Sequence, residues 1–150
     1  MALTYSSMLD LQTDLIKFEL LNSLTNKSFS SDSLDNEKPS LIMFICNHCP
    51  YVIHYHEELV KLANEYLENI NMIAISSNDI INYPQDRPEM MKNLWNDLGL
   101  SFPYLFDETQ AVPSLSKTIN VALSPSIIEL SSTIKAAFPP YFFAIFNAFL

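Results

Sequence analysis

Two cysteines separated by two residues are the side chains best suited to chemistry in this sequence. Cys46 and Cys49 are the only cysteines of the 150-residue chain, and His48 stands between them. A thiolate is a nucleophile, and a second thiol within reach can attack the mixed disulfide that the first one forms. The pair therefore predicts thiol–disulfide exchange, with Cys46 as the nucleophile and Cys49 as the resolving thiol.

The dithiol stands where a predicted strand gives way to a predicted helix. Residues 41–45 form a continuous apolar run that predicts a central strand buried on both faces, and Pro50 suits the first turn of a helix. The first N–H groups of a helix are unpaired, and its dipole is positive at this end. We therefore expect a lowered pKa for the Cys46 thiol, and a protonated His48 would favour the thiolate further.

The same pattern of cysteines occurs in zinc sites. A structural zinc ion takes four ligands, and only His48, His54 and His56 could complete a set with the two cysteines. On a helix, His54 and His56 point to nearly opposite faces, so they cannot both reach one ion held by the cysteines. We expect no metal or other cofactor, with one of these two histidines at the surface and the other half-buried.

The remaining elements must position the dithiol. Apolar patterning and breaker residues predict a β-hairpin within 18–34 that turns through Asn26. They predict helices from Pro50 to about Tyr66 and from Arg87 or Pro88 to a cap at Gly99, and a weaker helix over 114–119. Further strands are predicted over 70–75, 104–106 and 127–130. This alternation predicts an α/β fold in one domain, with a central mixed sheet flanked by helices. Trp95 lies on the apolar side of its helix and is predicted to be core.

Two aspartates, Asp79 and Asp107, follow the ends of predicted strands, where sites in such sheets gather. Solvated loop carboxylates are the favoured interpretation of both.

Several separate motifs resemble one family. Residues 43–52, MFICNHCPYV, resemble the signature of bacterial thioredoxin-like proteins of the AhpC/TSA type, as do residues 74–79, 83–88 and 102–110. The resemblance covers about residues 40–110. It implies a thioredoxin-like fold and thiol–disulfide oxidoreductase chemistry with Cys46 and Cys49 as the redox-active centre. It also implies a disulfide-containing protein or a small thiol or peroxide as substrate, and a cellular dithiol as reductant.

The resemblance ends beyond Gln110. Ser124–Pro125 could stand where the family has a Thr-Pro with a cis-proline beside the dithiol, and an ordinary loop proline is the alternative for Pro125. We expect a family-like core over about 15–130 and an atypical apolar tail over 131–150. This departure leaves open whether the sheet is complete at the C-terminus, and a disrupted copy without activity is one interpretation.

A peroxidase of the peroxiredoxin kind is the alternative enzyme. Such proteins attack peroxide with one cysteine, usually with a threonine three residues before it and an arginine nearby. Here Cys46 occupies the threonine position relative to Cys49, and Arg87 is the only arginine. The pair therefore favours disulfide exchange over peroxide reduction.

Net charge limits the classes of partner, and the character of the two chain ends bears on membranes and compartment. The net charge of −9 argues against nucleic acid and anionic membranes, which need a basic surface. The uncharged run over 136–150 is shorter than the roughly 20 residues of a membrane-spanning helix and contains two prolines. Residues 1–22 show no secretory signal, so we expect a cytoplasmic protein, in which a cysteine pair is more often catalytic or metal-binding than structural.

Overall fold

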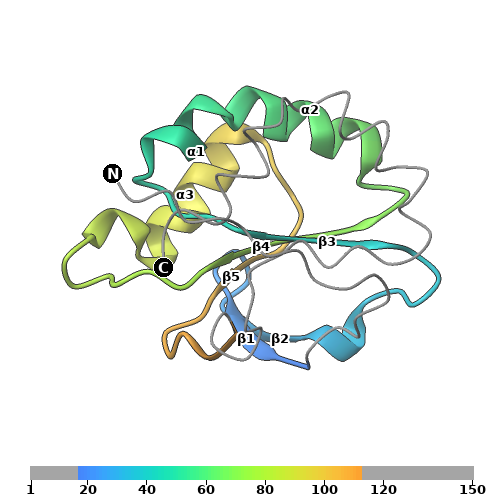
Figure 1. The fold of residues 1–150 in the computed structure, drawn as a ribbon, viewed down its shortest axis with the longest axis horizontal. Coiled ribbons are helices and arrows are strands. Elements are labelled where there is room, and N and C mark those ends of the chain that lie inside the picture. Colours follow the sequence, from blue (N-terminus) through green and yellow to red (C-terminus); the bar gives the residue numbers. More distant parts are fainter. Residues whose placement is uncertain (1–16, 113–150) are drawn as a thin grey trace, which may run out of the picture.

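A five-stranded mixed sheet organises residues 17–112, which are the residues that this computed structural model describes (Figure 1). The strands are β1 (Glu19–Asn22), β2 (Lys27–Ser30), β3 (Ser40–Phe44), β4 (Asn71–Ser76) and β5 (Tyr104–Phe106). Their order across the sheet is β2-β1-β5-β4-β3, in which β3, β4 and β5 are parallel and β1 is antiparallel to both of its neighbours. The predicted α/β class with a mixed sheet is confirmed.

The first parallel strand, β3, is buried on both faces as predicted, whereas its predicted central place in the sheet also depends on residues outside the described range and stays a prediction. Within residues 17–112, β3 pairs with β4 alone and lies at the edge of the sheet. Its side chains are nonetheless buried on both faces, because Leu41 and Met43 pack among the helices and Ile42 packs on the opposite face. A continuous apolar run therefore indicates that both faces of a strand are covered, but it does not indicate how many strands pair with it.

Three helices cover one face of the sheet: α1 (Pro50–His54), α2 (His56–Tyr66) and α3 (Pro88–Leu98) (Figure 1). Two short 3-10 helices, η1 (Ser31–Ser33) and η2 (Pro84–Asp86), complete the described elements. Buried residues of α2 and α3 pack on the sheet in one apolar cluster that includes Leu59, Leu62 and Met91. Within residues 17–112, no helix combines the length and the apolar character that crossing a bilayer requires.

The helix predicted from Pro50 to about Tyr66 is interrupted. Tyr55, with φ −98° and ψ 8°, separates α1 from α2. Ile53, in the first segment, is about half exposed, whereas Leu59 and Leu62 in the second are buried.

The hairpin turn and the last helical cap follow the sequence-based predictions. Asn26 has a φ of 55° between β1 and β2, and its N–H bonds the Asn22 carbonyl at 2.8 Å. Asparagine is among the few residues that adopt this left-handed conformation readily in place of glycine. Gly99 caps α3 with a φ of 69°.

The apolar side of α3 is set by Trp95. This side chain is fully buried, and its Nε1–H donates to the Phe102 carbonyl at 3.0 Å. Its predicted core position is confirmed. Met90, in the first turn of the same helix, is about half exposed.

Asp107 lies in the turn after β5, and its predicted role as a solvated loop carboxylate was wrong. It is buried rather than solvated, since its carboxylate accepts hydrogen bonds from the Thr109 hydroxyl at 3.0 Å and the Val112 N–H at 2.9 Å. Asp79 is exposed, as predicted. The predicted helix over 114–119, the strand over 127–130, Pro125 and the tail over 131–150 lie outside the described residues.

Candidate active site

The two cysteines lie at the carboxyl edge of the parallel strands. Cys46 follows the end of β3, and Cys49 is the N-cap of α1, directly before Pro50. Both are free thiols, with 7% and 2% of their surfaces exposed. The Cys49 backbone N–H donates a hydrogen bond to the Cys46 sulfur, so the two residues of the predicted dithiol are in contact.

A buried carboxylate, Asp86 in η2, binds the loop between the cysteines. Its Oδ1 accepts the backbone N–H groups of Asn47 at 2.8 Å and of His48 at 3.2 Å. Its Oδ2 accepts from His48 Nδ1 at 2.6 Å and from the Asn78 side-chain amide at 2.9 Å. Asp86 is fully buried. The anion held by N–H groups of this loop is therefore the Asp86 carboxylate.

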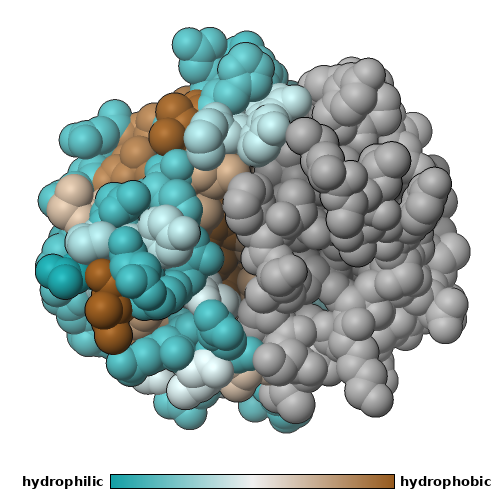
Figure 2. Space-filling view, turned by 60° about the vertical axis from the view of Figure 1, so that its left-hand side comes forward, coloured by the Kyte–Doolittle hydropathy of each residue, from teal (hydrophilic) through white to brown (hydrophobic). Residues whose placement is uncertain are grey.

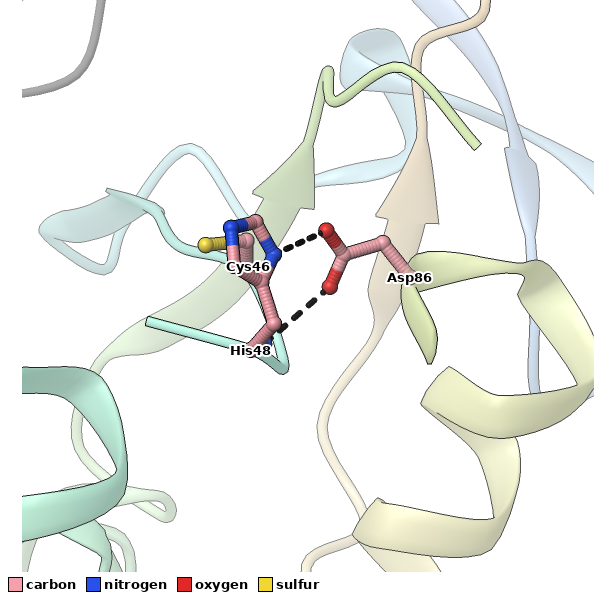
Figure 3. A group of neighbouring side chains, drawn as sticks. All are labelled: Cys46, His48 and Asp86. Carbon is pink, nitrogen blue, oxygen red and sulfur yellow. Dashed lines mark hydrogen bonds and ion pairs between the residues drawn. The ribbon is translucent and has the colours of Figure 1, made fainter. Parts of the chain in front are cut away.

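His48 is held on two sides. Besides its bond to Asp86, its ring stacks on Tyr83 with 4.3 Å between centroids and 5° between planes. The Cys46 sulfur, one imidazole nitrogen and one Asp86 oxygen lie within 4.8 Å of one another. In Figure 3 one ring nitrogen faces Asp86, and the other lies on the side of the ring where the sulfur is drawn.

Asn47 ties the same loop to β5 and to the residues before Asp86. Its side-chain amide donates to the Gln85 carbonyl at 2.9 Å, and its Oδ1 accepts from the Tyr104 hydroxyl at 3.0 Å. Tyr104 is fully buried, with its ring centroid 4.1 Å from that of Trp95. Burial raises the pKa of Tyr104 well above its ordinary value, and the nearby charges of Cys46 and Asp86 raise it further. The core of the protein thus sets the position of the loop.

The predicted ionisation of Cys46 was wrong. Burial raises the pKa of the Cys46 thiol to about 11, and the charge of Asp86 adds to this effect. Hydrogen bonds from the Cys49 N–H and the Asn78 side chain lower the pKa, but by less. The Cys49 N–H at the start of α1 thus lowers the pKa of the thiol by less than burial and the Asp86 charge raise it, and the His48 ring bonds Asp86.

Cys46, His48 and Asp86 carry the donor atoms that zinc binds in proteins. Both Asp86 oxygens, however, already accept two hydrogen bonds each, and an ion would have to displace some of them. The arrangement therefore favours a hydrogen-bonded site over a metal centre. His54 is exposed and His56 half-buried, as predicted.

Sequence reasoning missed Asp86, although the segment 83–88 was recognised as family-like. The only available signal was an acidic residue in a motif shared with the family. Its role depends on contacts with a loop 38 residues away in the sequence, which no local pattern reports. Arg87, the arginine that a peroxidase would use, is exposed.

The surface beside the dithiol is mixed in character. Figure 2 brings forward the side of the molecule that carries α1 and the loop before η2, and its described surface is mainly hydrophilic with separate apolar patches. Two aromatic residues next to the site are accessible, with Tyr51 59% and Tyr83 45% exposed.

Comparison with known proteins shows which family the chain belongs to. The sequence matches the redoxin family over residues 11–131. No curated protein sequence matches the chain. Among solved structures, an uncharacterized conserved protein from Geobacillus kaustophilus is 41% identical with a TM-score of 0.70, over 75% of this chain and 60% of that one. The chain thus spans less than two thirds of that relative's length.

Two more distant structures share the fold. A secreted disulfide oxidoreductase from Mycobacterium tuberculosis is 18% identical with a TM-score of 0.56, over 79% of this chain and 95% of that one. A peroxidoxin from the same organism is 17% identical with a TM-score of 0.57, over 81% and 74%. Members of the redoxin family are thiol oxidoreductases or peroxidases. With its AhpC/TSA-type motifs and its thioredoxin-like fold, the chain belongs to the redoxin family.

Proposed function

We propose that this protein is a thiol–disulfide oxidoreductase in which Cys46 is the nucleophile and Cys49 the resolving thiol. The observation that supports this assignment best is the contact between the two residues, in which the Cys49 N–H donates to the Cys46 sulfur. The chain has no third cysteine that could act as a resolving thiol. The nucleophilic and resolving sulfurs that disulfide exchange needs therefore both lie in one loop.

The reaction proceeds in two exchanges. Cys46 loses its proton and attacks one sulfur of a substrate disulfide, so that a mixed disulfide forms and one substrate thiol leaves with a proton. Cys49 then attacks the Cys46 sulfur, and the second substrate thiol leaves. Two electrons pass to the substrate, and a Cys46–Cys49 disulfide remains. A cellular dithiol returns this disulfide to the reduced form, in keeping with the cytoplasmic location that we propose.

The Cys46 thiol is protonated at neutral pH, so the mechanism needs a way to remove its proton. With a pKa of about 11, only about one molecule in ten thousand carries a Cys46 thiolate at pH 7. Attack at neutral pH thus needs a nearby group that accepts the proton as the sulfur reacts.

Reduction of insulin disulfides in the presence of dithiothreitol tests the function. We expect the wild-type protein to accelerate the reaction and Cys46→Ser to lose this activity. In a separate incubation without dithiothreitol, Cys49→Ser should accumulate a mixed disulfide with the substrate, visible by intact mass spectrometry, because the second exchange cannot occur. His54→Gln, an exposed change outside the dithiol, is the matched control and should behave as the wild type.

Two outcomes would contradict the proposal. Insulin reduction by Cys46→Ser at the wild-type rate would remove the nucleophile from its role. Peroxide consumption with dithiothreitol that is much faster than disulfide reduction would assign the protein to the peroxidases instead.

A further inference from the structure

The geometry points to Asp86 as a positioning residue that holds His48 as the acid–base group for Cys46. This inference rests on the proposed function, since it concerns how the proposed nucleophile loses its proton. It assigns a proton transfer between Cys46 and His48, with Asp86 of η2 holding the His48 ring of the dithiol loop.

The hydrogen bonds of Asp86 define the state of the His48 ring. Two backbone N–H groups and the Asn78 amide can only donate, so three of the four bonds to this carboxylate require acceptor oxygens. The carboxylate also faces His48 Nδ1 at 2.6 Å, which places the hydrogen on Nδ1. In the neutral ring, Nε2 then carries no hydrogen and can accept one.

The ring is also fixed in orientation. Stacking on Tyr83, at 4.3 Å and nearly parallel, holds its plane. One ring nitrogen, the Cys46 sulfur and an Asp86 oxygen lie within 4.8 Å of one another, and Figure 3 shows the ring between the sulfur and the carboxylate. Since Asp86 binds the His48 N–H and the imidazole together, it fixes both the backbone and the side chain of the residue.

The proton balance of the step is simple. As the Cys46 sulfur forms its bond to the substrate disulfide, its proton moves to Nε2 of His48 and an imidazolium forms beside the Asp86 carboxylate. The departing substrate sulfur takes the electron pair of the broken S–S bond and then receives the proton from His48. His48 and Asp86 end in their starting states, and the step needs no other reactant.

A purely electrostatic role for Asp86 makes the opposite prediction. The Asp86 charge raises the pKa of Cys46, so its removal by itself increases the thiolate fraction and accelerates attack at pH 7. Loss of a positioning residue slows the attack, because His48 no longer presents Nε2 to the sulfur. The sign of the rate change in Asp86→Asn therefore separates the two roles.

The test measures the first exchange alone. In a Cys49→Ser background, Cys46 reacts once with 2,2′-dithiodipyridine, an uncharged disulfide, at pH 7. We expect Asp86→Asn and His48→Gln each to slow this reaction about 10- to 100-fold, at the lower end of general acid–base effects. The exposed Asp79→Asn and His54→Gln are matched controls and should react as the parent does. Added imidazole should restore part of the rate in His48→Ala and leave the parent unchanged.

A faster reaction in Asp86→Asn, or an unchanged rate in His48→Gln, would overturn the inference. Should Asp86→Asn fail to fold, because it leaves buried N–H groups with fewer acceptors, His48→Gln and the imidazole response of His48→Ala decide the matter. A result that overturns the inference leaves the proposed function standing, as long as the parent protein reacts with the disulfide. A parent that does not react contradicts the proposed function itself.

Discussion

His48 Nδ1 lies 2.6 Å from Asp86 Oδ2, across 38 residues of sequence. The bond joins the loop that follows β3 to the short helix that follows β4 and its loop. Asp86 also accepts two backbone N–H groups of the dithiol loop. The conformation and the electrostatics of the cysteine pair are therefore set jointly by two neighbouring segments at the carboxyl edge of the sheet.

The ionisation of Cys46 should be shifted to high pH. Burial and the Asp86 charge raise its pKa to about 11, so the thiolate forms well above pH 9. Thiolate absorbance of Cys49→Ser, less that of Cys46→Ser/Cys49→Ser, measures this ionisation without the tyrosines. Asp86→Asn should move the midpoint to lower pH. A midpoint below that of an ordinary cysteine in the parent would contradict the assigned environment.

The folded protein should lose stability as the pH rises. The pKa of Cys46 is higher in the folded chain than in the unfolded one, where it is near 9.0, so the unfolded state releases its proton first. This contribution is complete below pH 9 and is lost as the pH rises toward 11. Urea denaturation at pH 8 and pH 10.5 checks it. Cys46→Ser, whose hydroxyl does not ionise in this pH range, should lose less stability between the two values, and an equal loss in both proteins would exclude a role for Cys46.

Removal of the Tyr104 hydroxyl should weaken the link between the core and the dithiol loop. Tyr104→Phe keeps the ring beside Trp95 but leaves the Asn47 Oδ1 without its donor. We expect a loss of about 1 kcal/mol in the free energy of unfolding. Urea denaturation provides the measurement, with the exposed Tyr51→Phe as the control that should change little. Equal stability of Tyr104→Phe and the wild type would show that this hydrogen bond contributes nothing.

The cap of α3 should depend on the backbone freedom of Gly99. Its φ of 69° disfavours a side chain, whereas an added Cβ meets no atom within 4 Å. Gly99→Ala should therefore lower the free energy of unfolding by about 1 kcal/mol through backbone strain alone. Asn93→Ala, an exposed change inside the same helix, should be neutral or slightly stabilising. Thermal or urea denaturation of the two variants gives the comparison, and a Gly99→Ala variant as stable as Asn93→Ala would contradict it.

Elements that carry local signals could be predicted from the sequence alone. Pro50 and Pro88 mark the starts of helices, Asn26 and Gly99 provide left-handed turns, and Trp95 lies on an apolar stripe. These features depend on neighbouring residues or on the period of one helix, so they can be recognised in a single chain. The position of Cys46 and Cys49 between a strand and a helix followed from the same signals.

The chemical character of the site, by contrast, depends on tertiary contacts. The Cys46 pKa, the role of Asp86 and the burial of Asp107 all depend on which distant residues pack together. The order of the described strands across the sheet likewise follows from strand pairing and not from the apolar composition of each strand. A pattern of residue types shows that a thiol stands before a helix, but its ionisation depends on burial and on charges that other segments bring within a few ångströms.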